Sequence, residues 1–240
     1  MLNNFRCISQ SSVFMTNQDL FGILYGSMLS GEFIMAKMWI WGQDAKAHFI
    51  KKALLGFHKV MDRHKIPYWL DFGTLLGAIR EGKIIEWDGD GDIGVWIEDL
   101  DKMKELQKEF MAEDLQIYYQ DSHAYLNLKV AKNRWEAIVD IYTYKKVSHN
   151  GQDWVVRIEN GKMFDIRGPY EHFEWRVLVP FLDTMFPVPC MFIESLEFLY
   201  GPEWKTPIRR EKEAYKVPEG DPEKLNKVGR SGRKRWKDVE

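Results

Sequence analysis

The sequence predicts a mixed α/β fold of the α+β type, with a mixed sheet flanked by helices. Apolar residues recur at spacings of three and four over residues 45–64, which is typical of a helix packed on a core. Residues 126–130 and 138–144 instead alternate in character, as strands do. The chain has 240 residues, of which 45% are apolar and 14% aromatic, so it can fill the core of one large domain.

Each expected element follows from local signals such as Pro67, Gly73, Glu81-Gly82 and Gly201-Pro202, which begin or end periodic segments. We expect helices at residues 45–64, 74–80, 98–112 and 193–200. We expect strands at residues 68–71, 92–97, 126–130 and 138–144, a weaker strand at 154–156, a turn at 168–169 and an extended segment at 186–189.

Composition divides the chain into three parts. We expect an N-terminal extension over residues 1–44, the main domain over residues 45–210, and a polar, basic tail over residues 211–240 that is disordered. The extension is largely apolar, but Asp19, Glu32 and Lys37 interrupt it, so we expect no transmembrane span and a cytoplasmic protein.

Charge and cysteine content exclude several classes of function. The net charge is −2, with nearly equal numbers of acids and bases, so we expect no nucleic-acid partner. The two cysteines, Cys7 and Cys190, are too few for a four-cysteine zinc site or a dense disulfide framework.

The acidic run Glu86-Trp-Asp-Gly-Asp-Gly-Asp-Ile-Gly94 carries the most information about function. Asp88, Asp90 and Asp92 occupy every second position, and in an extended chain alternate side chains share one face. Carboxylates held together repel one another unless a cation neutralises them, and Mg²⁺ prefers oxygen ligands of this kind. The run therefore predicts a metal-dependent phosphate chemistry.

Two other interpretations of the acidic run remain open. An EF-hand calcium loop also begins with carboxylates at alternate positions, but it requires Gly at its sixth position and Glu at its twelfth, where this chain has Ile93 and Asp99. The run could also be an acidic turn with no ligand. The apolar alternation that follows Asp92 suits a strand better than a calcium loop.

A phosphate site is indicated just upstream. Gly73 and Thr74 follow a strand and open a helix, where unpaired backbone N–H groups and the helix dipole attract an anion. We expect Arg80, at the end of that helix, to contact a diphosphate, and Asp71 to orient the loop or the substrate. Asp140 interrupts an apolar run, and it is the best candidate for a further carboxylate of the site because a buried lone charge is costly.

These residues resemble the LicD and fukutin-related family. The resemblance covers roughly residues 48–207 and is carried, in order, by Tyr68–Arg80, Trp87–Gly94, Val139–Tyr142, Phe186–Pro189 and Leu199–Trp204. It implies a nucleotidyltransferase-type fold for the main domain. It also implies transfer of a phosphorylated alcohol, such as phosphocholine, ribitol phosphate or glycerol phosphate, from a CDP-linked donor to a glycan hydroxyl, with release of CMP.

The resemblance also implies roles for single residues. Asp90 and Asp92 would be paired ligands of Mg²⁺ or Mn²⁺, Asp140 the third carboxylate, and Gly73 and Thr74 would lie at the donor phosphates. Asp88 would be at most a helper. The resemblance also allows a location in the lumen of the secretory pathway.

Two alternative functions remain open on the sequence. The same residues would serve a nucleotidyltransferase that makes an NDP-alcohol or NDP-sugar and releases pyrophosphate, because carboxylate spacing does not select the phosphorus that is attacked. The chain could also be a catalytically silent module that binds a glycan or a nucleotide.

Overall fold

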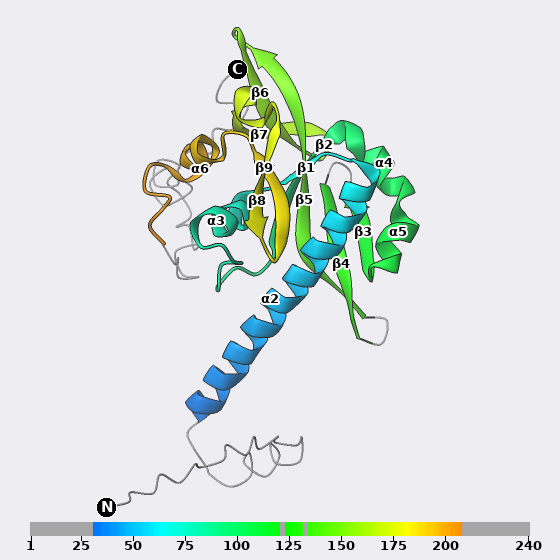
Figure 1. The fold of residues 1–240 in the computed structure, drawn as a ribbon, viewed down its shortest axis with the longest axis vertical. Helices are drawn as coiled ribbons and strands as arrows, with labels where there is room; N and C mark the ends of the chain where they lie inside the picture. Colours follow the sequence, from blue (N-terminus) through cyan, green and yellow to red (C-terminus); the bar gives the residue numbers. More distant parts are fainter. Residues whose placement is uncertain (1–30, 121–122, 132–133, 208–240) are drawn as a thin grey trace, which may run out of the picture. The chain divides into compact units, whose positions relative to one another are not determined.

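A mixed seven-stranded sheet forms the centre of the fold (Figure 1). The computed structural model describes residues 31–120, 123–131 and 134–207. In space, the main path of the sheet runs through β1 (Tyr68–Leu70), β2 (Gly91–Trp96), β5 (Arg134–His149), β4 (His123–Ala131) and β3 (Leu115–Gln120). β6 (Gln152–Glu159) pairs with β5, and β7 (Lys162–Pro169) pairs with β6.

The pair of β2 and β5 differs from the other strand pairs in its direction. β2 and β5 run parallel, whereas the other strand pairs of the described residues are antiparallel. β5 is long enough to pair with β2 and β4 along its first part and with β6 along its second part. β5 therefore joins the two ends of the sheet.

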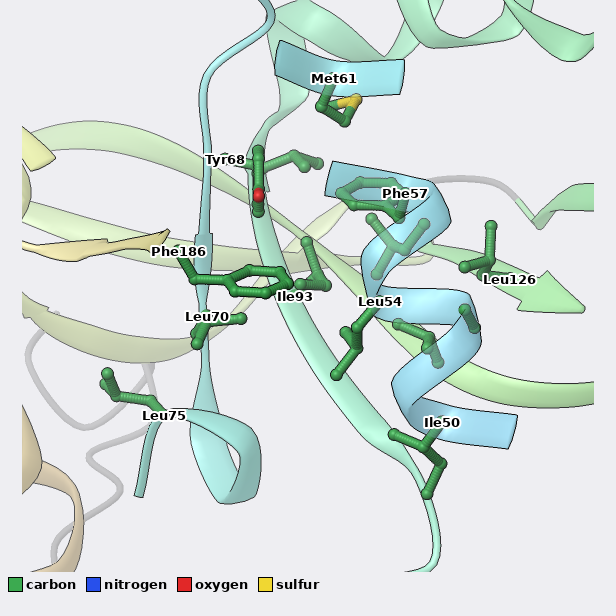
Figure 2. Packing of buried hydrophobic residues seen from close by; sticks show 14 of the residues in the cluster. Ile50, Leu54, Phe57, Met61, Tyr68, Leu70, Leu75, Ile93, Leu126 and Phe186 are labelled. Atoms are coloured by element: carbon green, nitrogen blue, oxygen red, sulfur yellow. The ribbon is translucent and has the colours of Figure 1, made fainter. Parts of the chain in front are cut away.

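Helix α2 (Gly31–His64) supplies one side of the core. The chain divides into a unit over residues 1–42 and a unit over residues 43–240, and the sheet belongs to the second. Within that unit, side chains at spacings of three and four along α2 are fully buried and pack with residues of the sheet (Figure 2). The α2 members labelled in Figure 2 are Ile50, Leu54, Phe57 and Met61.

The remaining elements complete the layers around the sheet. α3 (Phe72–Arg80) follows β1, and η1 (Ile97–Asp99), α4 (Leu100–Glu105) and α5 (Gln107–Ala112) follow β2. After β7 come η2 (Tyr170–Phe173), a two-stranded sheet of β8 (Arg176–Phe181) and β9 (Thr184–Pro189), and α6 (Phe192–Tyr200). The predicted mixed α/β fold with flanking helices is confirmed.

Two local predictions are wrong, and three strands were not predicted. The single helix expected at 98–112 is broken at Leu106, whose backbone leaves the helical region, and Met103 and Phe110 on either side of the break are both fully buried. The turn expected at Gly168-Pro169 is instead the end of β7. The strands β3, β7 and β8 were not expected, although Leu115 and Ile117 of β3 alternate with polar residues.

Two expectations concern the ends of the chain. The predicted disordered tail over residues 211–240 lies outside the described residues. Within the described part, no helix has the length and apolar character that crossing a membrane would require.

Candidate functional site

The sheet brings three carboxylates into one row. Asp92 of β2 and Asp140 of β5 are register partners in the parallel pair. Asp71 directly follows β1, and its backbone N–H donates to the carbonyl of Asp92 at 3.0 Å. Because residues in register on neighbouring strands project from the same face, the row gathers carboxylates from three strands that are far apart in sequence.

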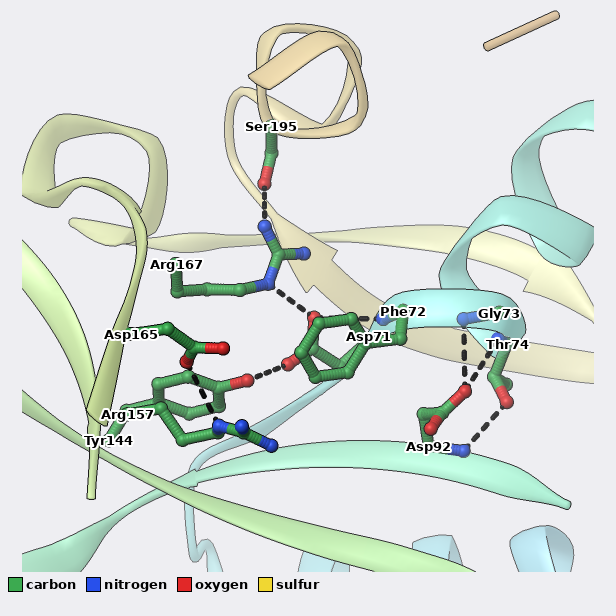
Figure 3. A network of polar contacts seen from close by, with 10 residues as sticks. All are labelled: Asp71, Phe72, Gly73, Thr74, Asp92, Tyr144, Arg157, Asp165, Arg167 and Ser195. Carbon is green, nitrogen blue, oxygen red and sulfur yellow. Dashed lines mark hydrogen bonds and ion pairs between the residues drawn. The ribbon is translucent and has the colours of Figure 1, made fainter. Parts of the chain in front are cut away.

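Asp92 is fixed to the first turn of α3 (Figure 3). Its Oδ2 accepts hydrogen bonds from the backbone N–H groups of Gly73 at 2.9 Å and Thr74 at 3.4 Å. Its own N–H donates to Thr74 Oγ1 at 2.8 Å. The positive end of the helix dipole therefore faces a carboxylate of the protein itself. The expectation that Gly73 and Thr74 bind donor phosphates stays a prediction, and it would require these amides to exchange one anion for another.

Asp71 is fully buried and saturated with hydrogen bonds. Its Oδ1 accepts from Phe72 N at 2.9 Å and from Arg167 Nε at 2.6 Å, and its Oδ2 accepts from Tyr144 Oη at 2.6 Å. A side chain with 0% exposure and these three donors does not reach a substrate in this structure. Of the two expected roles of Asp71, the geometry therefore supports orienting the loop and not contacting the substrate.

Phe72 sits in a strained conformation between Asp71 and Gly73. Its φ of +34° is in the left-handed region, which costs a residue with a side chain on the order of 1–3 kcal/mol. The Phe72 ring packs edge-on against Tyr142, with ring centroids 4.9 Å apart. Tyr142 Oη donates to Asp140 Oδ2 at 3.1 Å. Tyr142 thus connects the strained turn to the third carboxylate of the row.

The acidic run is only partly a strand, which corrects the expectation that its three carboxylates share one strand face. β2 begins at Gly91, so Asp92 lies in the strand while Asp88 and Asp90 lie in the preceding loop. Asp88 nevertheless lies against the turn, because a Cβ added at Gly73 would overlap Asp88 Oδ2 and come within 3.2 Å of Asp92 Oδ2. The absence of a side chain at Gly73 is what lets these carboxylates approach α3.

Four carboxylates form the cluster, namely Asp88, Asp90, Asp92 and Asp140, and burial together with neighbouring charges raises the pKa of the first three. Burial, followed by the charges of Asp88 and Asp90, raises the pKa of Asp92 well above its usual range. Burial and the charge of Asp90 raise the pKa of Asp88 to about 6. Partial burial and the charge of Asp140 raise the pKa of Asp90. The cluster therefore lacks positive charge, and a proton or a cation would stabilise it.

One lysine partly opposes this excess of negative charge. Lys46 of α2 lowers the pKa of both Asp88 and Asp90, and a Cβ added at Gly89 would lie 3.4 Å from its Nζ. Sequence reasoning missed Lys46, because nothing local relates it to an acidic loop some forty residues later in the chain.

The donor set of the cluster fits a hard divalent cation in chemistry. All of its groups are carboxylate oxygens, the ligands that Mg²⁺ and Mn²⁺ prefer. Among the described residues, no group of three acidic, histidine or cysteine side chains is already arranged to hold a metal ion. The cluster thus offers suitable ligands and excess negative charge without a preformed coordination geometry.

Arg80 lies apart from the cluster. It is at the C-terminal end of α3, where Nη2 pairs with Glu81 Oε1 at 2.6 Å and Nη1 donates to the carbonyl of Trp204 at 3.4 Å. With its side chain only 10% exposed, Arg80 ties the segment after α6 to α3. The structure does not bring it to the carboxylates, so its expected contact with a diphosphate has no geometric support.

Three further residues of the site were missed from the sequence. Tyr142 and Tyr144 alternate with Asp140 along β5, so their place on the same strand face was a signal that the sequence contained. Arg167 gave no such signal, since its partner Asp71 is 96 residues away. A cavity of about 630 Å³ lies between Lys51 of α2, Lys83 and the β8–β9 turn, but none of the cluster carboxylates lines it.

Comparison with known proteins finds relatives over the same part of the chain. The family model for the LicD/FKTN/FKRP nucleotidyltransferase domain matches residues 65–191. Ribitol-5-phosphate transferase FKTN of Homo sapiens is 25% identical over 161 residues, which cover 63% of this chain and 32% of the relative. Ribitol 5-phosphate transferase FKRP of Mus musculus is 29% identical over 157 residues, covering 60% of this chain and 29% of the relative.

A bacterial protein is similar over a shorter stretch. Lipopolysaccharide cholinephosphotransferase LicD of Haemophilus influenzae is 30% identical over 77 residues, which cover 32% of this chain and 25% of the relative. The matched parts thus span about a third or less of each relative's length. The family model covers 127 of the 240 residues (65 to 191 inclusive), including Asp71, the carboxylate cluster and Arg167. The chain belongs to the LicD/FKTN/FKRP family.

Proposed function

We propose that this chain transfers a phosphorylated alcohol from a CDP-linked donor to a glycan hydroxyl and releases CMP, in a reaction that depends on a divalent cation. The observation that carries the proposal is the cluster of carboxylates beside the N-terminal turn of α3, where Asp92 is bound by two amides and the pKa values of Asp88, Asp90 and Asp92 are raised. The names of the relatives, which transfer ribitol phosphate or phosphocholine, support the class of group that is moved.

The chain's own residues divide the work. Asp90, Asp92 and Asp140 would hold Mg²⁺ or Mn²⁺, and Asp88 lies close enough to Gly73 to join them. A bound divalent cation would supply positive charge against the donor's phosphate oxygens and stabilise the charge of the leaving CMP. The amides of Gly73 and Thr74 hold Asp92 in place, and Tyr142 holds Asp140.

The reaction is a displacement at phosphorus. The acceptor hydroxyl releases its proton to the solvent, and its oxygen forms a bond to the phosphorus that carries the alcohol. The bond from that phosphorus to the oxygen of CMP breaks. The products are CMP and a glycan that carries a phosphodiester.

The experiment distinguishes an enzyme that uses a CDP-alcohol as donor from one that makes it. The protein is incubated with CDP-ribitol, CDP-choline or CDP-glycerol, a glycan acceptor and Mg²⁺ or Mn²⁺, and CMP and phosphodiester are measured together. We expect CMP in step with phosphodiester, loss of both on addition of EDTA, and loss of both in Asp92→Asn and Asp140→Asn. Asp101→Asn is the matched control, because Asp101 is exposed on α4 and pairs only with Lys104 among the described residues.

Two outcomes would overturn the proposal. If CTP and an alcohol phosphate give pyrophosphate and a CDP-alcohol, the enzyme makes the donor and does not use it. If the protein binds a CDP-alcohol but turns over none of them with any cation, it is a binding module.

A further inference from the structure

A buried ion pair lies behind the strained turn of the site. Arg167 of β7 donates from Nε to Asp71 Oδ1 at 2.6 Å, and both side chains have 0% exposure. Arg167 Nη1 donates to Ser195 Oγ of α6 at 3.0 Å (Figure 3). Three elements that are distant in sequence, β1, β7 and α6, therefore meet at one guanidinium.

Arg167 contacts the turn at two consecutive residues. In addition to its bond with Asp71, the Arg167 guanidinium carbon lies 5.5 Å from the centre of the Phe72 ring. It also lies 5.2 Å from the centre of the Phe173 ring. Phe72 holds a positive φ that an isolated residue of this type avoids. Strain of this kind persists only where the surroundings hold it in place. Arg167 is the charged part of those surroundings.

The two turn residues that Arg167 contacts, Asp71 and Phe72, directly precede the two residues whose amides bind Asp92. Asp71 caps the first turn of α3 through Phe72 N, and the next two amides, of Gly73 and Thr74, bind Asp92 Oδ2. A small shift of the turn would move both donors away from the carboxylate. The position of Asp92 thus depends on a pair of charges that does not include it.

We propose that Arg167 is a positioning residue, which acts through Asp71 and Phe72 to hold the 71–74 turn against Asp92, and that Ser195 makes α6 part of this support. The inference rests on the proposed function where it concerns catalysis, because the turn then holds a metal ligand. That Arg167 holds the 71–74 turn in place is a property of the fold and does not depend on the proposed function. Outer partners of a metal site commonly change metal affinity or activity by about 10- to 100-fold when they are removed.

The competing explanation is that Arg167 only balances the buried charge of Asp71. A buried ion pair can often be replaced by uncharged residues of similar size without loss of stability, whereas removing one partner alone is strongly destabilising. The double variant Asp71→Asn/Arg167→Met separates the two explanations. Asn at residue 71 keeps an oxygen for the Phe72 amide, and no buried charge is left unpaired.

The experiment follows four variants with three readouts. The variants are Arg167→Met, Arg167→Lys, Ser195→Ala and the double variant. The readouts are the melting temperature, hydrogen exchange of the peptide over residues 71–76 compared with a peptide from β2, and kcat with KM for CMP release.

We expect the double variant to melt near the wild type, while residues 71–76 exchange faster, β2 is unchanged, and kcat falls about 10- to 100-fold. Arg167→Lys should not rescue these changes, because one ammonium group cannot reproduce the planar fork that binds Asp71 and Ser195 together. Ser195→Ala should change exchange and kcat in the same direction by less.

Wild-type exchange over residues 71–76 and wild-type kcat in the double variant would overturn the proposal and leave Arg167 as a balancing charge. If Arg167→Met does not fold, the double variant and Ser195→Ala still decide. If the wild type itself turns over no CDP-alcohol, the proposed function fails, while the exchange of residues 71–76 still reports whether Arg167 supports the turn.

Discussion

Gly73 of α3 and Asp88 of the loop before β2 are in direct contact, and a Cβ at residue 73 would overlap Asp88 Oδ2. The glycine is needed here for space, because its φ is not positive. We expect Gly73→Ala to push Asp88 away and to lower kcat for CMP release at least about tenfold. The helix preference of Ala over Gly, about 1 kcal/mol, should offset part of the loss in stability. Unchanged kcat with an unchanged Mg²⁺ midpoint in thermal shift would show that Asp88 is not needed at this position.

The raised pKa of Asp88 predicts a pH-dependent stability. This pKa is about 6 in the folded chain, whereas a free aspartate titrates near 3.9. The folded state thus binds the proton more tightly, so stability is lost as pH rises from about 4 through about 6, and it stays lost above. Asp88→Asn removes this cost and keeps the oxygen that accepts from Gly89 N.

Without divalent cations, Asp88→Asn should therefore be about 1–2 kcal/mol more stable than the wild type near pH 7.5, and the difference should shrink near pH 4.5. Urea unfolding in EDTA at both pH values measures it. Asp101→Asn, at an exposed position of α4, should show no such difference. Equal stability of Asp88→Asn and the wild type near pH 7.5 would contradict the raised pKa.

Lys46 predicts an effect on cation binding. Its charge lowers the pKa of Asp88 and Asp90, so it also repels any cation that these residues attract. Lys46→Met should raise the pKa of Asp88 further and reduce several-fold the Mg²⁺ concentration at the midpoint of the thermal shift. Lys52→Met is the control, since Lys52 lies on the same helix and pairs with Asp114. A higher midpoint in Lys46→Met would instead indicate that Lys46 helps to assemble the site.

Two tyrosines with different hydroxyl environments give a matched pair. Tyr142 Oη donates to Asp140, whereas Tyr119 Oη is buried without a hydrogen-bond partner among the described residues. Tyr142→Phe should keep the ring contact with Phe72, cost about 1 kcal/mol of stability, and weaken activity. Tyr119→Phe should be neutral or stabilising, with full activity. Melting curves and kcat of the two variants test this, and equal losses in both would remove the special role of Tyr142.

The sequence was enough to predict the strands that carry Asp92 and Asp140, but not that Asp88 and Asp90 lie in a loop and leave the strand face. Alternation from Asp92 onward and the interruption of an apolar run by Asp140 indicated the two strands that the structure pairs in register. The same alternation extends back through Asp88, yet β2 begins at Gly91. A Cβ at Gly91 would lie 3.2–3.4 Å from Val139, Leu54 and Ile50, so the first residue of β2 packs tightly against β5 and α2.

The arginines show why the support of the site could not be predicted. Arg80 is near the motif in sequence, but its partners are Glu81 and the carbonyl of Trp204. Arg167 lies in a segment where neighbouring residues on both faces of β7 are buried, so no periodicity marked it. A buried ion pair between residues 96 positions apart depends on how β7 and β1 are placed, which local patterns do not contain.

The long separation between Asp71 and Arg167 also orders events during synthesis of the chain. A ribosome that has reached the end of β5 has already made Asp71 and every carboxylate of the cluster, but not the guanidinium that lies against Asp71. Ser195, the next link, follows 28 residues after Arg167. Because chains emerge from the N-terminus, Asp71 must wait for its counter-charge until β7 has been made, and the serine that holds this counter-charge comes later still, with α6. A fragment cut at residue 191, where the matched family domain ends, would keep the chemistry-bearing residues and lose the serine that holds Arg167.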